Sequence, residues 1–177
     1  MIQEPARRVA LEARAVAALI RAGAFGGQGP RKTARSLQTL RAFGPLGAAS
    51  HLSALRYGDL PAVADERGEL SWQALDEAVN RFAGGLRARG LQPGDGVGIL
   101  CRNHRVALIA AFAASRNGMN GVWMNTSFSE RQAREVAERE GIALLVHDAE
   151  YDELAAEIPL QHGTVRVDIE SAADEAD

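Results

Sequence analysis

The segment that decides the fold reads LSWQALDEAVNRFAGGLRARG (residues 70–90), LQPGDGVGILCRNH (91–104) and RVALIAAFAASRNGMNGVWMN (105–125). Its first part has apolar residues at spacings of three, four, three and four, which is typical of a helix with one buried stripe. Ser71 stands where a helix N-cap belongs, and Gly90 follows the last turn as a C-terminal cap. The sequence therefore predicts an amphipathic helix that begins at Trp72 and ends before Gly90.

Strands and helices alternate after this helix. Residues 97–100 form a short apolar run that predicts a buried strand, and residues 104–117 are apolar nearly all round, which predicts a buried helix. Ser129 and Gln132 match a capping box at the start of a helix that ends at Glu140. This alternation predicts an α/β fold, a partial doubly wound and mostly parallel sheet with flanking helices. The remaining expected elements are strands at 122–124, 143–146 and 165–167 and a short helix at 152–157.

The part before this fold is expected to be an N-terminal helical segment. Its helices are expected at residues 5–24 and 34–43, separated by a flexible linker at residues 26–30. A hairpin follows at residues 62–71. We therefore divide the chain into an N-terminal helical and linker segment (1–57), a partial α/β domain (58–168) and an acidic tail (169–177) that is expected to fray.

The charge is uneven along the chain, because residues 1–44 hold eight basic and two acidic residues although the net charge is −3. A solvated helix is the favoured interpretation of this basic part, and weak peripheral contact with a membrane through residues 1–44 is the alternative. No aromatic residues interleave the arginines of the helix at 129–140, so nucleic-acid binding is not expected. The longest apolar run, residues 106–114, is too short to span a bilayer, and a single cysteine fits a reducing compartment. We expect a soluble, cytoplasmic protein.

Three sequence patterns invite a catalytic or ligand-binding interpretation. Glycines 94 and 96 precede the strand at 97–100 and glycine 98 falls inside it, whereas a dinucleotide fingerprint follows a strand, so we interpret this run as a turn. Cys101 and His104 could form a nucleophile pair, but a buried cysteine beside a helix-start histidine is favoured. His147 and Asp148 follow a strand and could touch a metal or phosphate, although a pair at the surface of a loop is favoured.

The polar run Asn125, Thr126 and Ser127 is the candidate substrate-binding site. It follows a predicted strand, and small polar side chains at the carboxyl end of a strand can line a ligand crevice. The same residues also suit a turn that leads into the capped helix, and the capping box favours this alternative. We assign no catalytic, cofactor-binding or metal-binding residue, since the four histidines show no metal-ligand spacing.

Several short sequence motifs in residues 58–168 resemble motifs in the N-terminal domain of the AMP-binding, adenylate-forming enzymes, in the acyl-CoA synthetase (fatty-acid CoA ligase) branch. Leu70-Ser71-Trp72-Gln73-Ala74-Leu75 stands where that family often has Leu-Thr-Tyr-x-Glu-Leu. Arg116-Asn117-Gly118 stands where it often has Lys-x-Gly, and Asn125-Thr126-Ser127-Phe128 is similar to a turn in many of its bacterial members.

This resemblance implies a reaction for the full-length family. Its members activate a fatty acid with ATP and Mg to an acyl-adenylate and transfer the acyl group to CoA. The resemblance also implies that the phosphate loop, the adenine- and ribose-binding residues and the catalytic lysine lie beyond residue 177, so no cofactor is expected to bind this chain.

The sequence therefore predicts a truncated or split part of an acyl-CoA synthetase that is inactive alone. The first alternative is a noncatalytic scaffold or regulatory module that pairs with a separate C-terminal ligase chain. The second is an unrelated small hydrolase that uses Cys101. An incomplete sheet would leave an unpaired edge and an uncovered apolar face, so we expect poor solubility or dependence on a partner chain.

Overall fold

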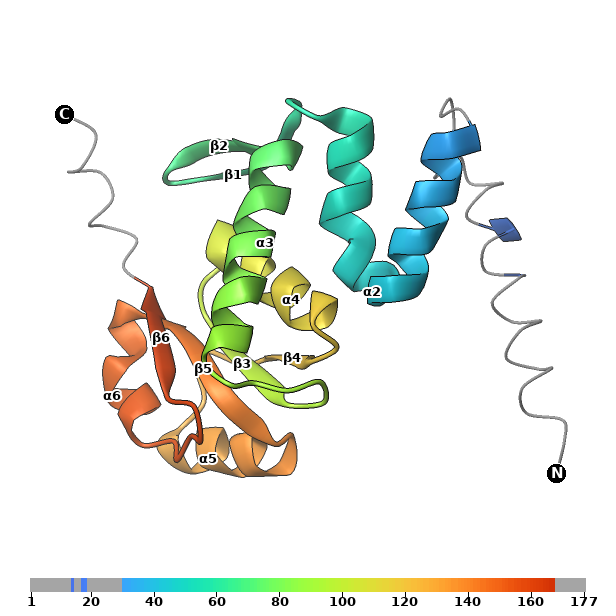
Figure 1. Ribbon diagram of the computed structural model, residues 1–177. Coiled ribbons are helices and arrows are strands. Elements are labelled where there is room, and N and C mark those ends of the chain that lie inside the picture. The colour runs from blue at the N-terminus through green and yellow to red at the C-terminus, as the bar shows by residue number, and fades with distance from the viewer. Residues whose placement is uncertain (1–13, 15–16, 19–29, 168–177) are drawn as a thin grey trace, which may run out of the picture. The chain divides into compact units, whose positions relative to one another are not determined.

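A computed structural model describes residues 14, 17–18 and 30–167 of the chain (Figure 1). The chain divides into two compact units, residues 1–39 and 40–177. The described residues of the first unit are helical. The rest of the helix expected at 5–24, residues 26–29 of the linker expected at 26–30, and the acidic tail lie outside the described residues, whereas Pro30 belongs to a helix.

Helix α2 (Pro30–Tyr57) is much longer than the helix expected at residues 34–43. Gly44 interrupts it with non-helical dihedral angles (φ 69°, ψ 176°), and Pro45 follows. The pair Gly44-Pro45 suggests the end of a helix, but proline also suits the first turn of a new helical run because it lacks an N–H that would be unpaired there. The helical conformation therefore resumes at Pro45.

A hairpin and a helix follow as the sequence predicts. Strands β1 (Pro61–Asp65) and β2 (Gly68–Ser71) are antiparallel, and α3 (Trp72–Ala88) begins directly after them. The Ser71 hydroxyl accepts a hydrogen bond from the Ala74 N–H at 3.2 Å, which confirms the N-cap. Leu75, Val79 and Leu86 are almost completely buried, so the apolar stripe faces the core.

The central sheet has four parallel strands in the order β4-β3-β5-β6. Every residue of the two inner strands is buried, as expected for a sheet covered on both faces. The strands are β3 (Gly96–Leu100), β4 (Asn120–Trp123), β5 (Ile142–Asp148) and β6 (Thr164–Val167).

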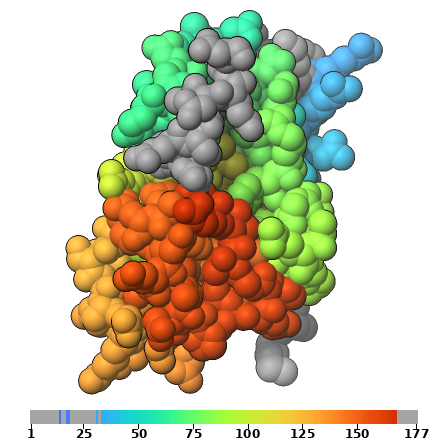
Figure 2. Space-filling view, turned by 90° about the vertical axis from the view of Figure 1, so that its left-hand side faces the viewer, coloured from blue at the N-terminus to red at the C-terminus, as the bar shows by residue number. Residues whose placement is uncertain are grey.

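Helices cover both faces of this sheet, which confirms the predicted α/β class (Figure 1). Helices α3 and α4 (Arg105–Arg116) pack on one face, and their core includes Val97 and Ile99 of β3. Helices α5 (Glu130–Arg139) and α6 (Asp152–Ala156) pack on the other, where the core includes Leu100 and Leu145. A short 3₁₀ turn, η1 (Ala149–Tyr151), precedes α6. Figure 2 shows α5, α6 and β6 together on one side of the molecule.

The glycines near β3 serve the turn and the strand. Gly94 has a φ of +97° in the turn before the strand. A Cβ on Gly96 would lie 2.5 Å from the Gly141 carbonyl oxygen, so only glycine fits at this close approach. The dinucleotide interpretation has no support here, because Gly96 and Gly98 lie within β3 rather than in a loop that opens a helix.

Candidate functional site

The topology places the candidate site at the carboxyl ends of β3 and β5. After β3 the chain passes through α4 to β4 on one side of β3, and then returns to form β5 on its other side. In open α/β sheets this reversal of strand order marks the crevice where ligands bind. Cys101 follows the end of β3, and Asp148 is the last residue of β5.

Cys101, His104 and Asp148 form a buried polar cluster at this point. His104 Nε2 lies 2.8 Å from Asp148 Oδ1, and the other carboxylate oxygen of Asp148 accepts the Arg102 backbone N–H at 2.7 Å. His104 Nδ1 accepts the Val106 N–H at 3.2 Å and so caps α4. The Cys101 thiol donates to the Val146 carbonyl oxygen, with Sγ 3.6 Å from that oxygen.

This hydrogen bonding argues against a nucleophilic cysteine. Since His104 Nδ1 accepts a hydrogen bond, Nε2 carries the proton that is donated to Asp148, and neither nitrogen is free to take a proton from the thiol. Burial, together with the negative charge of Asp148, raises the pKa of the Cys101 thiol to about 12. The structure therefore supports a buried cysteine and a helix-start histidine rather than the hydrolase alternative.

The same three residues offer a sulfur, a nitrogen and an oxygen atom within 4.8 Å of one another. Such a ligand set suits zinc. Coordination through His104 Nε2, however, would put a proton on Nδ1, which would then face the Val106 N–H donor. The described hydrogen bonds therefore favour a structural cluster that joins the ends of β3 and β5 to the start of α4.

The expected placement of His147 and Asp148 on a loop surface is wrong. Both belong to β5, and their exposed fractions are 3% and 4%. The strand extends beyond the predicted residue 146 because His147 and Asp148 pair with Arg166 and Val167 of β6. Each of these pairs joins residues that are 19 positions apart, so the local sequence does not reveal it.

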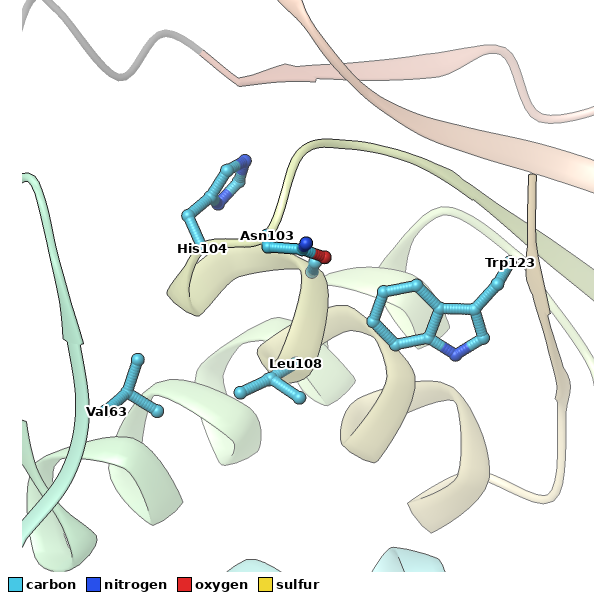
Figure 3. A pocket seen from close by; sticks show the side chains of 6 residues that line it. Val63, Asn103, His104, Leu108 and Trp123 are labelled. Carbon is cyan, nitrogen blue, oxygen red and sulfur yellow. The ribbon is translucent and has the colours of Figure 1, made fainter. Parts of the chain in front are cut away.

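An apolar pocket lies beside this cluster, with a volume of about 200 Å³ (Figure 3). Trp123 of β4 forms one wall and Val63 of β1 another, and the start of α4 lies between them. His104 reaches the pocket, but both of its ring nitrogens are engaged as described above. The lining residues are Val63, Asn103, His104, Ala107, Leu108 and Trp123.

The candidate residues Asn125, Thr126 and Ser127 lie in the exposed turn after β4 and outside the lining of this pocket. The Asn125 side-chain oxygen accepts the Ser127 N–H at 2.9 Å. Ser129 and Gln132 then form the predicted capping box at the start of α5. This local bonding is what a turn that leads into a helix requires, and a substrate-binding role for the three residues stays a prediction.

A buried ionic network was not found from the sequence. Arg116 donates to Asp76 Oδ1 at 2.8 Å, to Ser50 Oγ at 2.7 Å and to the Gly47 carbonyl oxygen at 2.9 Å. Burial opposes ionisation of Asp76, but hydrogen bonds from His51, Arg116 and Ser50 outweigh it and lower the pKa of the carboxyl. The sequence signals were an arginine near the end of an otherwise apolar helix and an aspartate beside the apolar stripe of α3.

A second ion pair anchors the hairpin to α4. Asp65 of β1 accepts the Arg105 backbone N–H at 2.9 Å and the Arg105 Nε–H at 2.8 Å. These hydrogen bonds from Arg105 hold the pKa of Asp65 well below its usual range. The pair therefore caps the start of α4 from outside the helix and fixes the wall of the pocket that contains Val63.

Comparison with known proteins identifies the family. The profile of the family described as AMP-binding enzyme matches residues 51–177, more than half of the chain. The chain belongs to the AMP-binding enzyme family. Among curated members, the 3-oxocholest-4-en-26-oate CoA ligase of Rhodococcus rhodochrous is 29% identical over 97 residues, which are 55% of this chain and 18% of the relative.

Solved structures of a CoA ligase and a CoA synthetase share the fold. The anthranilate CoA ligase AuaEII, in complex with anthranoyl-AMP, has a TM-score of 0.66 at 15% identity over 71% of this chain and 25% of that one. The o-succinylbenzoate CoA synthetase of Bacillus subtilis, in complex with ATP and magnesium ion, has a TM-score of 0.59 at 24% identity over 72% of this chain and 34% of that one. This AMP-binding enzyme chain thus spans about a fifth of the first curated relative and a quarter to a third of these two solved chains.

Proposed function

We propose that this chain supplies the N-terminal α/β scaffold of an acyl-CoA synthetase. The observation that carries the proposal is the family match over residues 51–177, together with relatives that are CoA ligases. The reaction we assign to the whole ligase joins a carboxylic acid to CoA through an acyl-adenylate, with ATP and Mg. The anthranilate CoA ligase that shares this fold is described with such an acyl-adenylate.

The acid we propose as substrate has a large apolar body, and a fatty acid is one such acid. Three of the similar proteins are named for a steroid acid, an aromatic acid and medium- or long-chain fatty acids. These acids share a carboxylate on an apolar group, which supports the class of substrate.

The residues of this chain do not fit Mg-ATP. The printed sequence has a single lysine, Lys32, and contains no Ser/Thr/Gly-rich loop that ends in Pro-Lys-Gly. At the carboxyl ends of β3 and β5 the polar atoms of His104 and Asp148 are already paired with one another and with backbone groups. We therefore assign no step of the reaction to residues of this chain.

The partners we propose follow from this scaffold role. The rest of a ligase polypeptide, in the same or in a separate chain, would supply the phosphate-binding and catalytic groups. None of the helices in the described part of the chain is both long and apolar enough to cross a membrane. Peripheral membrane contact through residues 1–44 and a cytoplasmic location stay predictions.

A reconstitution experiment tests this function. The chain is purified with and without the polypeptide encoded directly after codon 177, and acyl-CoA is measured by chromatography after incubation with ATP, Mg, CoA and a panel of fatty, aromatic and steroid acids. We expect acyl-CoA only when both parts are present. Acyl-CoA formation by the chain alone, or none by the combined parts, would overturn the proposal.

A further inference from the structure

Strand β4 is an edge strand of the sheet that the described residues form. Within the described residues it pairs only with β3. The Asn120 N–H donates to Asp95 and the Met124 N–H donates to Ile99, so the even-numbered residues direct their backbone groups toward β3. Because this direction alternates along a strand, the backbone groups of Gly121 and Trp123 point away from the sheet.

The two edges of the sheet differ in charge. On β6, Arg166 is paired with the Asp152 carboxylate, and edge charges of this kind discourage pairing with another strand. Strand β4 reads Asn-Gly-Val-Trp and has no charged residue. An edge without charge, proline or a covering element is a template for an added strand.

An apolar surface continues from this edge. Trp123 is 53% exposed and Leu108 is 36% exposed, although both are large apolar side chains. Between them and Val63 lies the pocket of about 200 Å³, which has no charged lining residue (Figure 3). Tryptophan is enriched among the residues that contribute most to binding at protein interfaces, so a half-exposed tryptophan beside an apolar pocket is typical of a binding surface.

We infer that the β4 edge and this pocket, defined by Val63, Leu108, Gly121 and Trp123, form the docking surface for an extended segment of the remaining ligase polypeptide. The inference rests on the proposed function. The first curated relative is more than five times as long as its matched part, so most of such a ligase lies outside the part that this chain matches. The docked segment adds a fifth strand beside β4 and inserts an apolar side chain next to Trp123.

Three variants of the chain separate the parts of this inference. Gly121→Pro removes an N–H that points away from β3, so it blocks an added strand and keeps the β3–β4 ladder. Trp123→Ser removes the anchor. Leu46→Ser is the matched control, because Leu46 is 51% exposed and lies on α2, outside this surface.

The test is the dissociation constant of each variant for the polypeptide encoded after codon 177, measured by isothermal titration calorimetry, with circular dichroism to verify folding. We expect Gly121→Pro and Trp123→Ser to weaken binding at least tenfold and Leu46→Ser to leave it within twofold of wild type. Equal binding by all four proteins overturns the inference and leaves the proposed function standing. If wild type does not bind, the inference and the proposed function are both overturned. If instead the chain self-associates and Gly121→Pro abolishes this self-association, the β4 edge binds a second copy of the chain and the inference is overturned.

Discussion

Arg116 is a charged side chain at the end of a helix whose buried residues are otherwise apolar. Its guanidinium also donates to Asn80 Oδ1 at 2.6 Å, so it connects α2, α3 and α4. We expect Arg116→Met to lower the free energy of unfolding by about 3–5 kcal/mol, because the Asp76 charge would be left buried without its partner. Urea unfolding measures this, with Arg81→Met on the exposed face of α3 as the control, expected to stay within about 0.5 kcal/mol.

Asp76 also makes stability depend on pH. Its pKa in the folded chain lies below the ordinary value of 3.8, so its charged form stabilises the fold above that pH. As the pH falls below about 4 through the folded pKa, this contribution is lost. We expect the urea midpoint to fall between pH 6 and pH 3 more steeply in wild type than in Asp76→Asn. Parallel curves for the two proteins would contradict the assignment.

Cys101 is expected to be unreactive in the folded chain. Burial raises the pKa of its thiol to about 12, so almost no thiolate exists at neutral pH. Iodoacetamide at pH 7.5, followed by mass spectrometry, should leave native protein unmodified and add one group per chain in 6 M guanidinium chloride. Rapid modification of the native chain would show that the thiol is exposed or ionised.

At the scale of the elements, the junction of β3 with the turn after α5 depends on Gly96. A methyl group there would meet the Gly141 carbonyl oxygen at 2.5 Å, whereas a methyl group at Gly85 in α3 would meet nothing within 4 Å. We expect Gly96→Ala to destabilise the chain by about 2 kcal/mol or more, since backbone must shift. Gly85→Ala should stabilise it by about 0.5–1 kcal/mol through helix propensity. The melting temperatures of the two variants, measured by thermal unfolding, test this expectation, and Gly96→Ala should melt at the lower temperature. Similar melting temperatures would contradict the close packing at Gly96.

Elements with a clear local signal could be predicted from the sequence. The stripe of α3, the Ser71 cap and the Ser129–Gln132 capping box depend on residues a few positions apart, and the structure has them where they were expected. Helix α2 and the end of β5 could not be placed. Gly44-Pro45 has two local interpretations, and β5 extends through His147 and Asp148 only because β6 pairs with it.

The candidate site was less predictable than the fold. Cys101 and His104 were visible as neighbours, but Asp148, which bonds to His104, lies 44 residues away. The same holds for Arg116 and Asp76, which are 40 residues apart and meet only because α3 and α4 pack together. Side-chain partners of this kind are set by the arrangement of the elements, which no local spacing contains.

At the scale of the whole molecule, the described part of the chain has a fully hydrogen-bonded interior, but one edge of its sheet, strand β4, is not paired with a further described strand. Within the described residues, no buried side-chain nitrogen or oxygen lacks a hydrogen-bond partner. The β4 edge and Trp123, by contrast, are open to solvent. Poor solubility without a partner stays a prediction, and this open surface is its physical reason.

The central claim is that this chain is a scaffold without the chemistry of adenylation. Acid-dependent exchange of labelled pyrophosphate into ATP measures that chemistry directly and does not require CoA. For the purified chain alone, supplied with ATP, Mg and the panel of acids, we predict no exchange above the blank without protein. Exchange that depends on both the chain and an acid would contradict the claim, because the adenylating groups would then have to lie within these 177 residues.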